Sequence, residues 1–287
     1  MLEFKDKTAV VTGAAHGVGR ALVFAFAKEG MNVVLADINQ DSLNNTLTEL
    51  QREGYNNCLA VKTDVTDLES VVNLAKESFN AFGKVHILCN NAGVGLAESK
   101  RKIWTLPNKD WDWGFAVNTM GAVNGIQAFV PKMLEMDEEC HLINTSSSNG
   151  GLTSLATTPI YAASKAAVTS LTEVLHYQLL EEKSKLKASV MFPGPHLVNT
   201  NILNSNISRP ERFSAENGKK PGAYVDMKEL AKSAGIAFKL TEPEEVATYT
   251  LEGIRQDQFW ILPPSEKQDK KLQDRTNSIL QRKNPQL

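Results

Sequence analysis

The sequence predicts one α/β domain built as a doubly wound parallel sheet with helices on both faces. Short apolar runs alternate with longer amphipathic stretches, as in successive βαβ units. The runs are continuously apolar, as expected for strands covered on both faces. No internal repeat and no Gly/Ser-rich linker divides the chain, so we treat residues 1–287 as a single domain.

The apolar and amphipathic periodicities place the elements in order. Strands are predicted over Thr8–Thr12, Val33–Ala36, Cys58–Val61, Val85–Cys89, His141–Asn144, Ala188–Phe192 and Phe259–Leu262. Helices are predicted over Gly17–Glu29, Asp41–Arg52, Leu68–Phe82, Asp110–Leu134, Ile160–Glu182 and Glu244–Arg255. We expect Asp41 to be an N-cap and Gly83 a C-cap.

Two stretches depart from this alternation. Residues 199–240 are polar, carry Pro210 and Pro221, and contain one helix-like piece, Met227–Ala237. Because long irregular segments in compact domains are usually functional or disordered, we expect a substrate lid here. The charged tail 263–287 is expected to lie in solvent, with packing on a neighbouring subunit as the alternative.

Composition and charge exclude several classes of protein. The net charge of −2 provides no field for nucleic acid or an anionic membrane. No apolar run approaches the roughly 18 residues of a spanning helix, and the charged N-terminus does not resemble a secretory signal. Cys58, Cys89 and Cys140 have no metal-ligand spacing. We therefore expect a cytoplasmic protein with reduced thiols and no metal site.

A glycine-rich turn follows the first predicted strand. It runs from Thr12 to Gly19 with the spacing GxxxGxG, and a helix follows directly. Glycines let the backbone approach a pyrophosphate, and the helix N-terminus offers free N–H groups to it. The strand–turn–helix context predicts a dinucleotide site that includes Gly13, His16, Gly17, Val18 and Gly19.

Acidic residues at two strand ends predict how adenosine is held. Asp37 ends the second strand, where a carboxylate can accept hydrogen bonds from both ribose hydroxyls and repel a 2′-phosphate. Ile38 follows it in place of a cation, and His16 is not a fixed cation, so NAD is favoured over NADP. Asp64-Val65 closes the third strand. Its carboxylate is predicted to meet the adenine amine, or alternatively to cap the next helix.

Tyr161 and Lys165 lie one turn apart on one face of a predicted helix. A free tyrosine has a pKa near 10, and a nearby ammonium lowers the pKa of the phenol. Such a pair can exchange a proton with a substrate oxygen. By itself the YxxxK spacing is a common accident.

In combination, the motifs from residue 8 to about 200 resemble the short-chain dehydrogenase/reductase family. Added to the glycine turn and the Tyr/Lys pair are Asn90-Asn91-Ala92-Gly93, Asn118, a run of serines, and Pro193-Gly194. The resemblance implies a Rossmann-like fold in which Tyr161 is the general acid/base and Lys165 binds the nicotinamide ribose and tunes the pKa of Tyr161. It implies that Asn118 supports a water-linked proton path to Lys165. Asn91, beside Gly93, would contact the adenosine, and Pro193 and Gly194 would contact the nicotinamide.

Two positions depart from the family pattern. The strand motif Asn-x-Ser-Ser points to Ser147 as the serine that holds the substrate oxygen, whereas the usual interval of 13 residues before Tyr161 points to Ser148. We prefer Ser147, because a loop absorbs an extra residue more easily than a strand does. Thr200, expected near the carboxamide, follows Pro193-Gly194 two residues later than in the family. The intervening His196 is predicted to be an ordinary loop residue.

The resemblance implies NAD-dependent interconversion of a secondary alcohol and a ketone, with a bulky hydrophobic substrate favoured. Alternatives are an NADPH-dependent ketone reductase and a catalytically inactive NAD-sensing protein. A homotetramer or a dimer is expected. We expect Trp104, Trp111 and Trp113 to serve packing. Apolar candidates in the expected lid are Ile202, Leu203, Ile207, Phe213, Tyr224, Met227 and Phe238.

Overall fold

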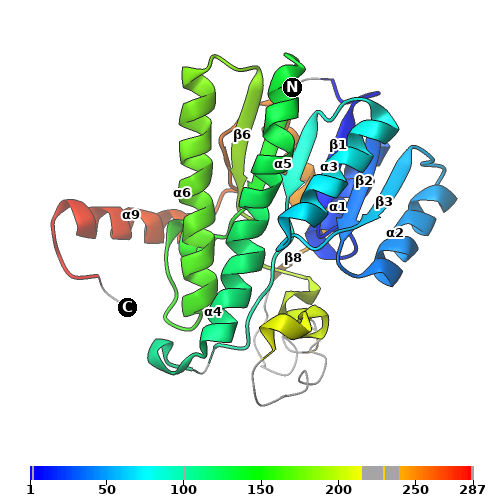
Figure 1. Ribbon diagram of the computed structural model, residues 1–287. Helices are drawn as coiled ribbons and strands as arrows, with labels where there is room; N and C mark the ends of the chain where they lie inside the picture. Colours follow the sequence, from blue (N-terminus) through cyan, green and yellow to red (C-terminus); the bar gives the residue numbers. More distant parts are fainter. Residues whose placement is uncertain (2, 100, 215–228, 230–238, 286–287) are drawn as a thin grey trace.

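The fold is organised around a seven-stranded sheet in which every neighbouring pair is parallel. This computed structural model describes residues 1, 3–99, 101–214, 229 and 239–285 (Figure 1). The strand order is β3-β2-β1-β4-β5-β6-β9. The strands are β1 (Thr8–Thr12), β2 (Asn32–Asp37), β3 (Cys58–Lys62), β4 (Ile87–Asn90), β5 (Cys140–Thr145), β6 (Leu186–Met191) and β9 (Trp260–Ile261).

Helices cover both faces of this sheet, which confirms the predicted doubly wound class. One apolar core joins the sheet to α1 (Gly17–Lys28), α2 (Gln40–Arg52) and α8 (Pro243–Arg255). The other joins it to α3 (Leu68–Phe82), α5 (Gly121–Glu135) and α6 (Pro159–Glu181). The chain winds outward from β1 in one direction and from β4 in the other. The carboxyl ends of these two strands therefore flank the crevice where ligands of such sheets bind.

Several predicted boundaries are wrong in detail. Helix α2 begins at Gln40, and its cap is Asn39, whose side chain accepts from the Ser42 N–H at 3.0 Å; Asp41 lies inside the first turn. The helix predicted over Asp110–Leu134 is three pieces, α4 (Asn108–Phe115), the π-helical turn η2 (Ala116–Met120) and α5. Gly83 does end α3, with a positive φ of 73°.

The segment beyond β6 is more structured than the sequence predicts. Residues Leu197–Val198 (β7) and Leu240–Thr241 (β8) pair as a two-stranded parallel sheet. The charged tail forms helix α9 (Glu266–Leu280), which contacts the body through Gln268, Leu272 and Arg275, although none of its residues is completely buried. Its far end extends away from the body (Figure 1). The predicted helix Met227–Ala237 lies outside the described residues, apart from Glu229. No helix within the described ranges is long and apolar enough to span a bilayer.

The tryptophans behave unequally. Trp113 is 1% exposed and belongs to a small apolar cluster with Val65 and Val117. Trp111 stacks on Phe115 with 6.2 Å between ring centroids. Trp104 is 79% exposed, so the prediction that it serves packing is wrong.

Replacing Phe26 tests the core between α1 and the sheet. Its side chain is fully buried and meets the Phe4 ring edge to face at 6.3 Å. Phe26→Ala should lower the free energy of unfolding by about 3–5 kcal/mol, because the lost apolar contacts leave a cavity. Urea denaturation measures the change. Ile279→Ala on the exposed face of α9 is the control, and an equal loss in both variants would contradict this assignment.

Candidate functional site

The glycine turn between β1 and α1 is packed too closely against neighbouring atoms to carry side chains. A Cβ on Gly19 would lie 2.1 Å from the Gly13 carbonyl oxygen, so only glycine fits there. Gly17 has a positive φ of 53°. His16, at the N-cap of α1, makes no side-chain capping bond. The first-turn N–H groups of a helix have no partner within the helix, so this end of α1 suits a diphosphate.

The two predicted adenosine contacts lie on the same side of the crevice. The Asp37 carboxylate accepts from the Ala15 N–H at 3.1 Å and from the Asn39 N–H at 3.0 Å. The Asp64 carboxylate is bonded to Arg212 and to Thr66. These bonds hold the pKa of Asp64 below its ordinary value, against the effect of burial. The N-cap of α3 is Asp67, so the alternative prediction that Asp64 caps this helix is wrong.

Asn91 joins the ends of the central strands. Its side-chain amide donates to the Thr12 carbonyl at 3.0 Å, and its backbone N–H donates to the Thr12 hydroxyl at 3.0 Å. A Cβ on Gly93 would lie 3.4 Å from both the Lys165 ammonium and the Asn118 carbonyl oxygen. The turn after β4 thus connects the glycine turn to the residues on α6.

Tyr161 lies in the first turn of α6 with its phenol against Ser147. The Ser147 hydroxyl donates to the phenol oxygen and lowers its pKa, but burial has the larger effect and raises the pKa of Tyr161 above its ordinary value. This direction differs from the sequence-based expectation that Lys165 lowers it. Of the two candidate serines, Ser147 is the one bonded to the phenol. Ser148 is the first residue of the irregular turn η3 (Ser148–Leu152).

Burial acts on Lys165 as well. Burial lowers the pKa of its ammonium from 10.5 to about 8, so its positive charge is held weakly. The ammonium donates to the Thr145 carbonyl at 2.8 Å and lies 5.8 Å from the centre of the Tyr161 ring. Lys165 is therefore beside Tyr161, but burial makes both groups favour their neutral forms.

Asn118 lies in the π-helical turn η2 and fixes the start of α6 indirectly. Its carbonyl oxygen accepts from the Val94 N–H at 2.8 Å, and its amide donates to the Ser164 hydroxyl at 3.0 Å. The Ser164 hydroxyl in turn donates to the Tyr161 carbonyl at 2.8 Å. This side chain thus ties the turn after β4 to the helix that carries Tyr161.

Most of the predicted site residues line one cavity of about 840 Å³, a volume typical of small-molecule sites. Those on its wall are Gly13, His16, Gly17, Val18, Asp37, Ile38, Asp64, Val65, Asn91, Gly93, Ser147, Ser148, Tyr161, Lys165, Pro193 and Thr200. Gly19, Asn118 and Gly194 lie behind it. Gly194 donates its N–H to the Tyr249 hydroxyl at 3.1 Å.

Several described residues of the expected lid line this cavity, among them Thr200, Ile202 and Ser205. A Cβ on Gly17 would lie 2.9 Å from the methyl carbon of Thr200, at the diphosphate end. The Ser205 hydroxyl accepts from the Gly95 N–H at 3.1 Å, and Phe213 packs near Val65. Of the apolar candidates, Tyr224, Met227 and Phe238 lie outside the described residues.

Two further residues at the cavity carry no sequence motif. Gln268 of α9 donates to the Pro195 carbonyl at 3.0 Å and lines the cavity. Glu98 also lines it, from the loop after β4. The sequence did not predict Gln268 or Glu98 as site residues, because one lies in a charged tail and the other in a polar loop, and neither segment carries a motif.

His196, predicted to be an ordinary loop residue, is exposed and also lines the cavity.

Comparison with known proteins shows which family the chain is related to. A model described as "short chain dehydrogenase" matches residues 7–210. The "CLA biosynthesis dehydrogenase/reductase" of Lactiplantibacillus plantarum is 29% identical over 98% of this chain and 95% of its own. The "1-deoxy-11-beta-hydroxypentalenate dehydrogenase" of Streptomyces exfoliatus is 37% identical over 67% of this chain and 68% of its own. A crystal structure of a short chain dehydrogenase/reductase from Burkholderia phymatum in complex with NAD is 36% identical, with a TM-score of 0.89, and covers 100% of this chain and 99% of its own.

The buried ammonium of Lys165 makes stability depend on pH. Below about pH 8 the folded protein holds a buried charge, whereas above it the folded state releases the proton before the unfolded state does. The unfolding free energy of the wild type relative to Lys165→Met should therefore rise between pH 8 and pH 10, by up to about 3 kcal/mol. Urea titrations at several pH values test this. The exposed Lys185→Met is the control, and a flat difference for Lys165→Met would refute the effect.

Proposed function

Since the chain belongs to the short chain dehydrogenase family, and is thus an oxidoreductase of a family that uses nicotinamide cofactors, we propose that it interconverts a secondary alcohol and a ketone with NAD. The observation that carries the proposal is the contact of the Ser147 hydroxyl with the Tyr161 phenol, beside Lys165, in a cavity that begins at the glycine turn.

The residues along the crevice fit a dinucleotide. Gly13 and Gly17 line the cavity at the N-terminus of α1, where the diphosphate would lie. Asp37 would accept from the adenosine ribose, and Lys165 would donate to the ribose next to the nicotinamide. When bound, the nicotinamide would accept the hydride in the oxidation or donate it in the reduction.

Ser147 and Tyr161 handle the substrate oxygen. In the proposed reduction, the phenol of Tyr161 donates a proton to the developing alkoxide while the Ser147 hydroxyl holds the same oxygen. The raised pKa of Tyr161 keeps the phenol protonated in the unliganded site, which suits an acid. In the oxidation, Tyr161 must first release its phenol proton to solvent. The phenolate, stabilised by the protonated Lys165 side chain, then accepts the alcohol proton as the substrate carbon gives up its hydride.

Asp37 and Ile38 support NAD over NADP. Both line the cavity at the end of β2, where a 2′-phosphate on the ribose would meet the carboxylate and find an apolar neighbour. Like-charge contact of this kind discriminates by repulsion.

The cavity wall supports a bulky hydrophobic substrate. Apolar side chains from several elements line it. They are Leu96, Trp113, Leu155, Ile202, Leu203 and Ile207. The relative from Streptomyces exfoliatus is named for a hydroxy compound, which agrees with an alcohol substrate.

We also propose a homo-oligomer, a dimer or a tetramer. Helix α6 exposes Val174, Tyr177 and Leu180 at half or more of their surface. Such an apolar row on a long helix suits contact with a second copy of the chain.

Tyr161→Phe tests the proton transfer. The variant keeps the ring but has no proton to exchange, so turnover in a screen of secondary alcohols should fall at least about a hundredfold. NADH affinity, measured by fluorescence, should stay within about threefold, because the hydroxyl contributes little to cofactor binding. Tyr177→Phe, on the exposed face of the same helix, is the matched control. Retention of a tenth of the wild-type turnover would disprove the role.

Asp37→Ala combined with Ile38→Arg tests the cofactor preference. Loss of the carboxylate and gain of a cation should shift the ratio of kcat/KM for NAD and NADP by about two to three decades toward NADP. Asp41→Ala, which removes a carboxylate from the first turn of α2, should leave the ratio unchanged. A wild-type enzyme that prefers NADPH would overturn the assignment and favour a ketone reductase.

A further inference from the structure

The N-terminus of α6 lacks a cap from its own sequence. Thr158 occupies the N-cap position, but its side chain makes no capping hydrogen bond. Its hydroxyl instead accepts from the Asn149 amide at 2.6 Å. Pro159 removes one N–H donor, and the N–H groups that follow need acceptors from elsewhere in the fold.

Glu98 supplies those acceptors from the loop after β4. One carboxylate oxygen accepts from the Ile160 N–H at 2.8 Å, and the other accepts from the Tyr161 N–H at 3.1 Å. The Glu98 side chain is almost completely buried, with 1% of the residue exposed. A carboxylate at this end of a helix is also stabilised by the helix dipole. Burial raises the pKa of Glu98, and the two N–H groups oppose that effect.

The second of these donors is the backbone of Tyr161 itself. Glu98 therefore holds the residue that bears the phenol, 63 positions away in the sequence, at its main chain. The Ser164 hydroxyl holds the carbonyl of the same residue at 2.8 Å. With both its N–H and its carbonyl bonded to fixed groups, Tyr161 has a defined position relative to Ser147.

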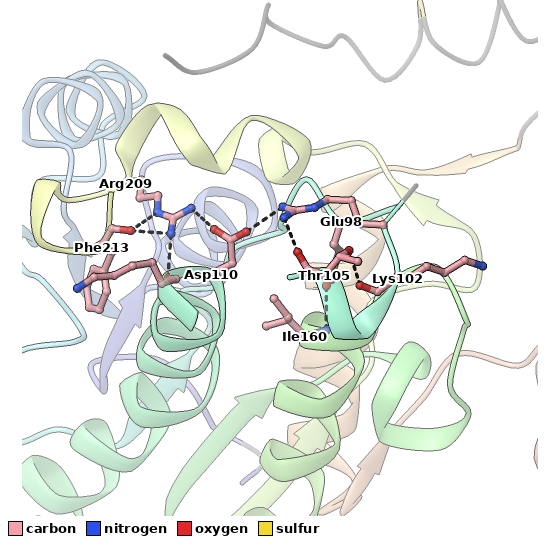
Figure 2. A network of polar contacts seen from close by, with 9 residues as sticks. Glu98, Lys102, Thr105, Asp110, Ile160, Arg209 and Phe213 are labelled. Atoms are coloured by element: carbon pink, nitrogen blue, oxygen red, sulfur yellow. Dashed lines mark hydrogen bonds and ion pairs between the residues drawn. The ribbon is translucent and has the colours of Figure 1, made fainter. Parts of the chain in front are cut away.

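The loop that carries Glu98 is anchored by a chain of ion pairs (Figure 2). Arg101 donates to one oxygen of Asp110 at 3.1 Å and to the Thr105 carbonyl at 3.0 Å. The other oxygen of Asp110 accepts from Arg209 at 2.8 Å. Arg209 also donates to the Phe213 carbonyl in the described lid. One carboxylate on α4 thus holds both the Glu98 loop and the lid.

We propose that Glu98 is the positioning residue for Tyr161, and that Asp110 ties this cap to the lid segment 201–213. The inference rests on the proposed function for its catalytic meaning, but the positioning itself is a property of the fold. Glu98 touches no reacting atom; it acts by fixing the backbone of Tyr161. Each backbone N–H has its own acceptor oxygen, and a carboxylate provides two such oxygens where a side-chain amide provides one.

Glu98→Gln is the sharpest variant, because it keeps the shape of the side chain. Its amide offers one acceptor oxygen and one donor NH₂ group, so one of the two backbone N–H groups loses its partner. The Tyr161 backbone should shift, and the phenol with it. Asp67→Ala is the matched control, since it removes a carboxylate cap from α3, a helix that carries none of the proposed catalytic residues.

The experiment reads the Tyr161 phenol directly and needs no substrate. The protein is labelled with tyrosine carrying ¹³C at the phenol carbon, and the Tyr161 signal is assigned by its loss in Tyr161→Phe. In Glu98→Gln this signal should move by more than its linewidth, while the other four tyrosine signals stay in place. It should not move in Asp67→Ala. An unmoved Tyr161 signal in folded Glu98→Gln overturns the proposal.

If Glu98→Gln does not fold, Arg101→Met provides a second test of the same proposal. It leaves the carboxylate in place but releases the loop from Asp110, so the Tyr161 signal should move in the same direction by a smaller amount. An unmoved signal in this variant would then overturn the proposal.

Turnover separates this proposal from the proposed function. If the wild type oxidises a secondary alcohol, kcat should fall about tenfold or more in Glu98→Gln, while the affinity for NADH stays unchanged. A moved Tyr161 signal in a protein without dehydrogenase activity would support the positioning role and refute the proposed function. Full kcat in Glu98→Gln would refute the positioning role alone.

Discussion

Thr12 and Asn91 join the carboxyl ends of β1 and β4 through two hydrogen bonds of 3.0 Å. The Asn91 backbone N–H donates to the Thr12 hydroxyl, and the Asn91 side-chain amide donates to the Thr12 carbonyl. These strands diverge into the two halves of the sheet, so the joint fixes where the crevice opens. The glycine turn begins at Gly13 on one side, and Gly93 approaches Lys165 on the other. The glycine turn and the Tyr161/Lys165 pair, to which we assign cofactor binding and proton transfer, are therefore positioned by one set of contacts.

Burial of polar groups is the second constraint on the site. Tyr161 and Lys165 are both buried, and desolvation shifts both pKa values toward the neutral forms. Their hydrogen bonds to Ser147 and to the Thr145 carbonyl offset part of that cost. The outcome is a pair of buried groups whose neutral forms are both favoured by burial.

Residues beyond the shared family region shape the outer wall of the cavity. The family match ends at residue 210, yet Arg212 bonds to Asp64 and Gln268 bonds to the Pro195 carbonyl. Both contacts connect late segments of the chain to positions that the early motifs define.

The sequence by itself determined the layered fold, the glycine turn and the Tyr161/Lys165 pair. Each depends on local order: strand and helix periodicity, turn glycines, and a spacing of four residues on one helix face. The sequence left Ser147 and Ser148 open, and only the folded turn at Ser148–Leu152 shows which hydroxyl meets the phenol.

Tertiary structure alone decided the cap on the helix that carries Tyr161. Glu98 lies 62 positions before Ile160, in a polar loop with no motif, and the packing of the α4 region against α6 brings them together. The same holds for the Asp64–Arg212 pair, which is separated by 148 positions. Such contacts escape sequence reasoning because they depend on how loops pack after the sheet has formed, and local periodicity carries no record of that packing.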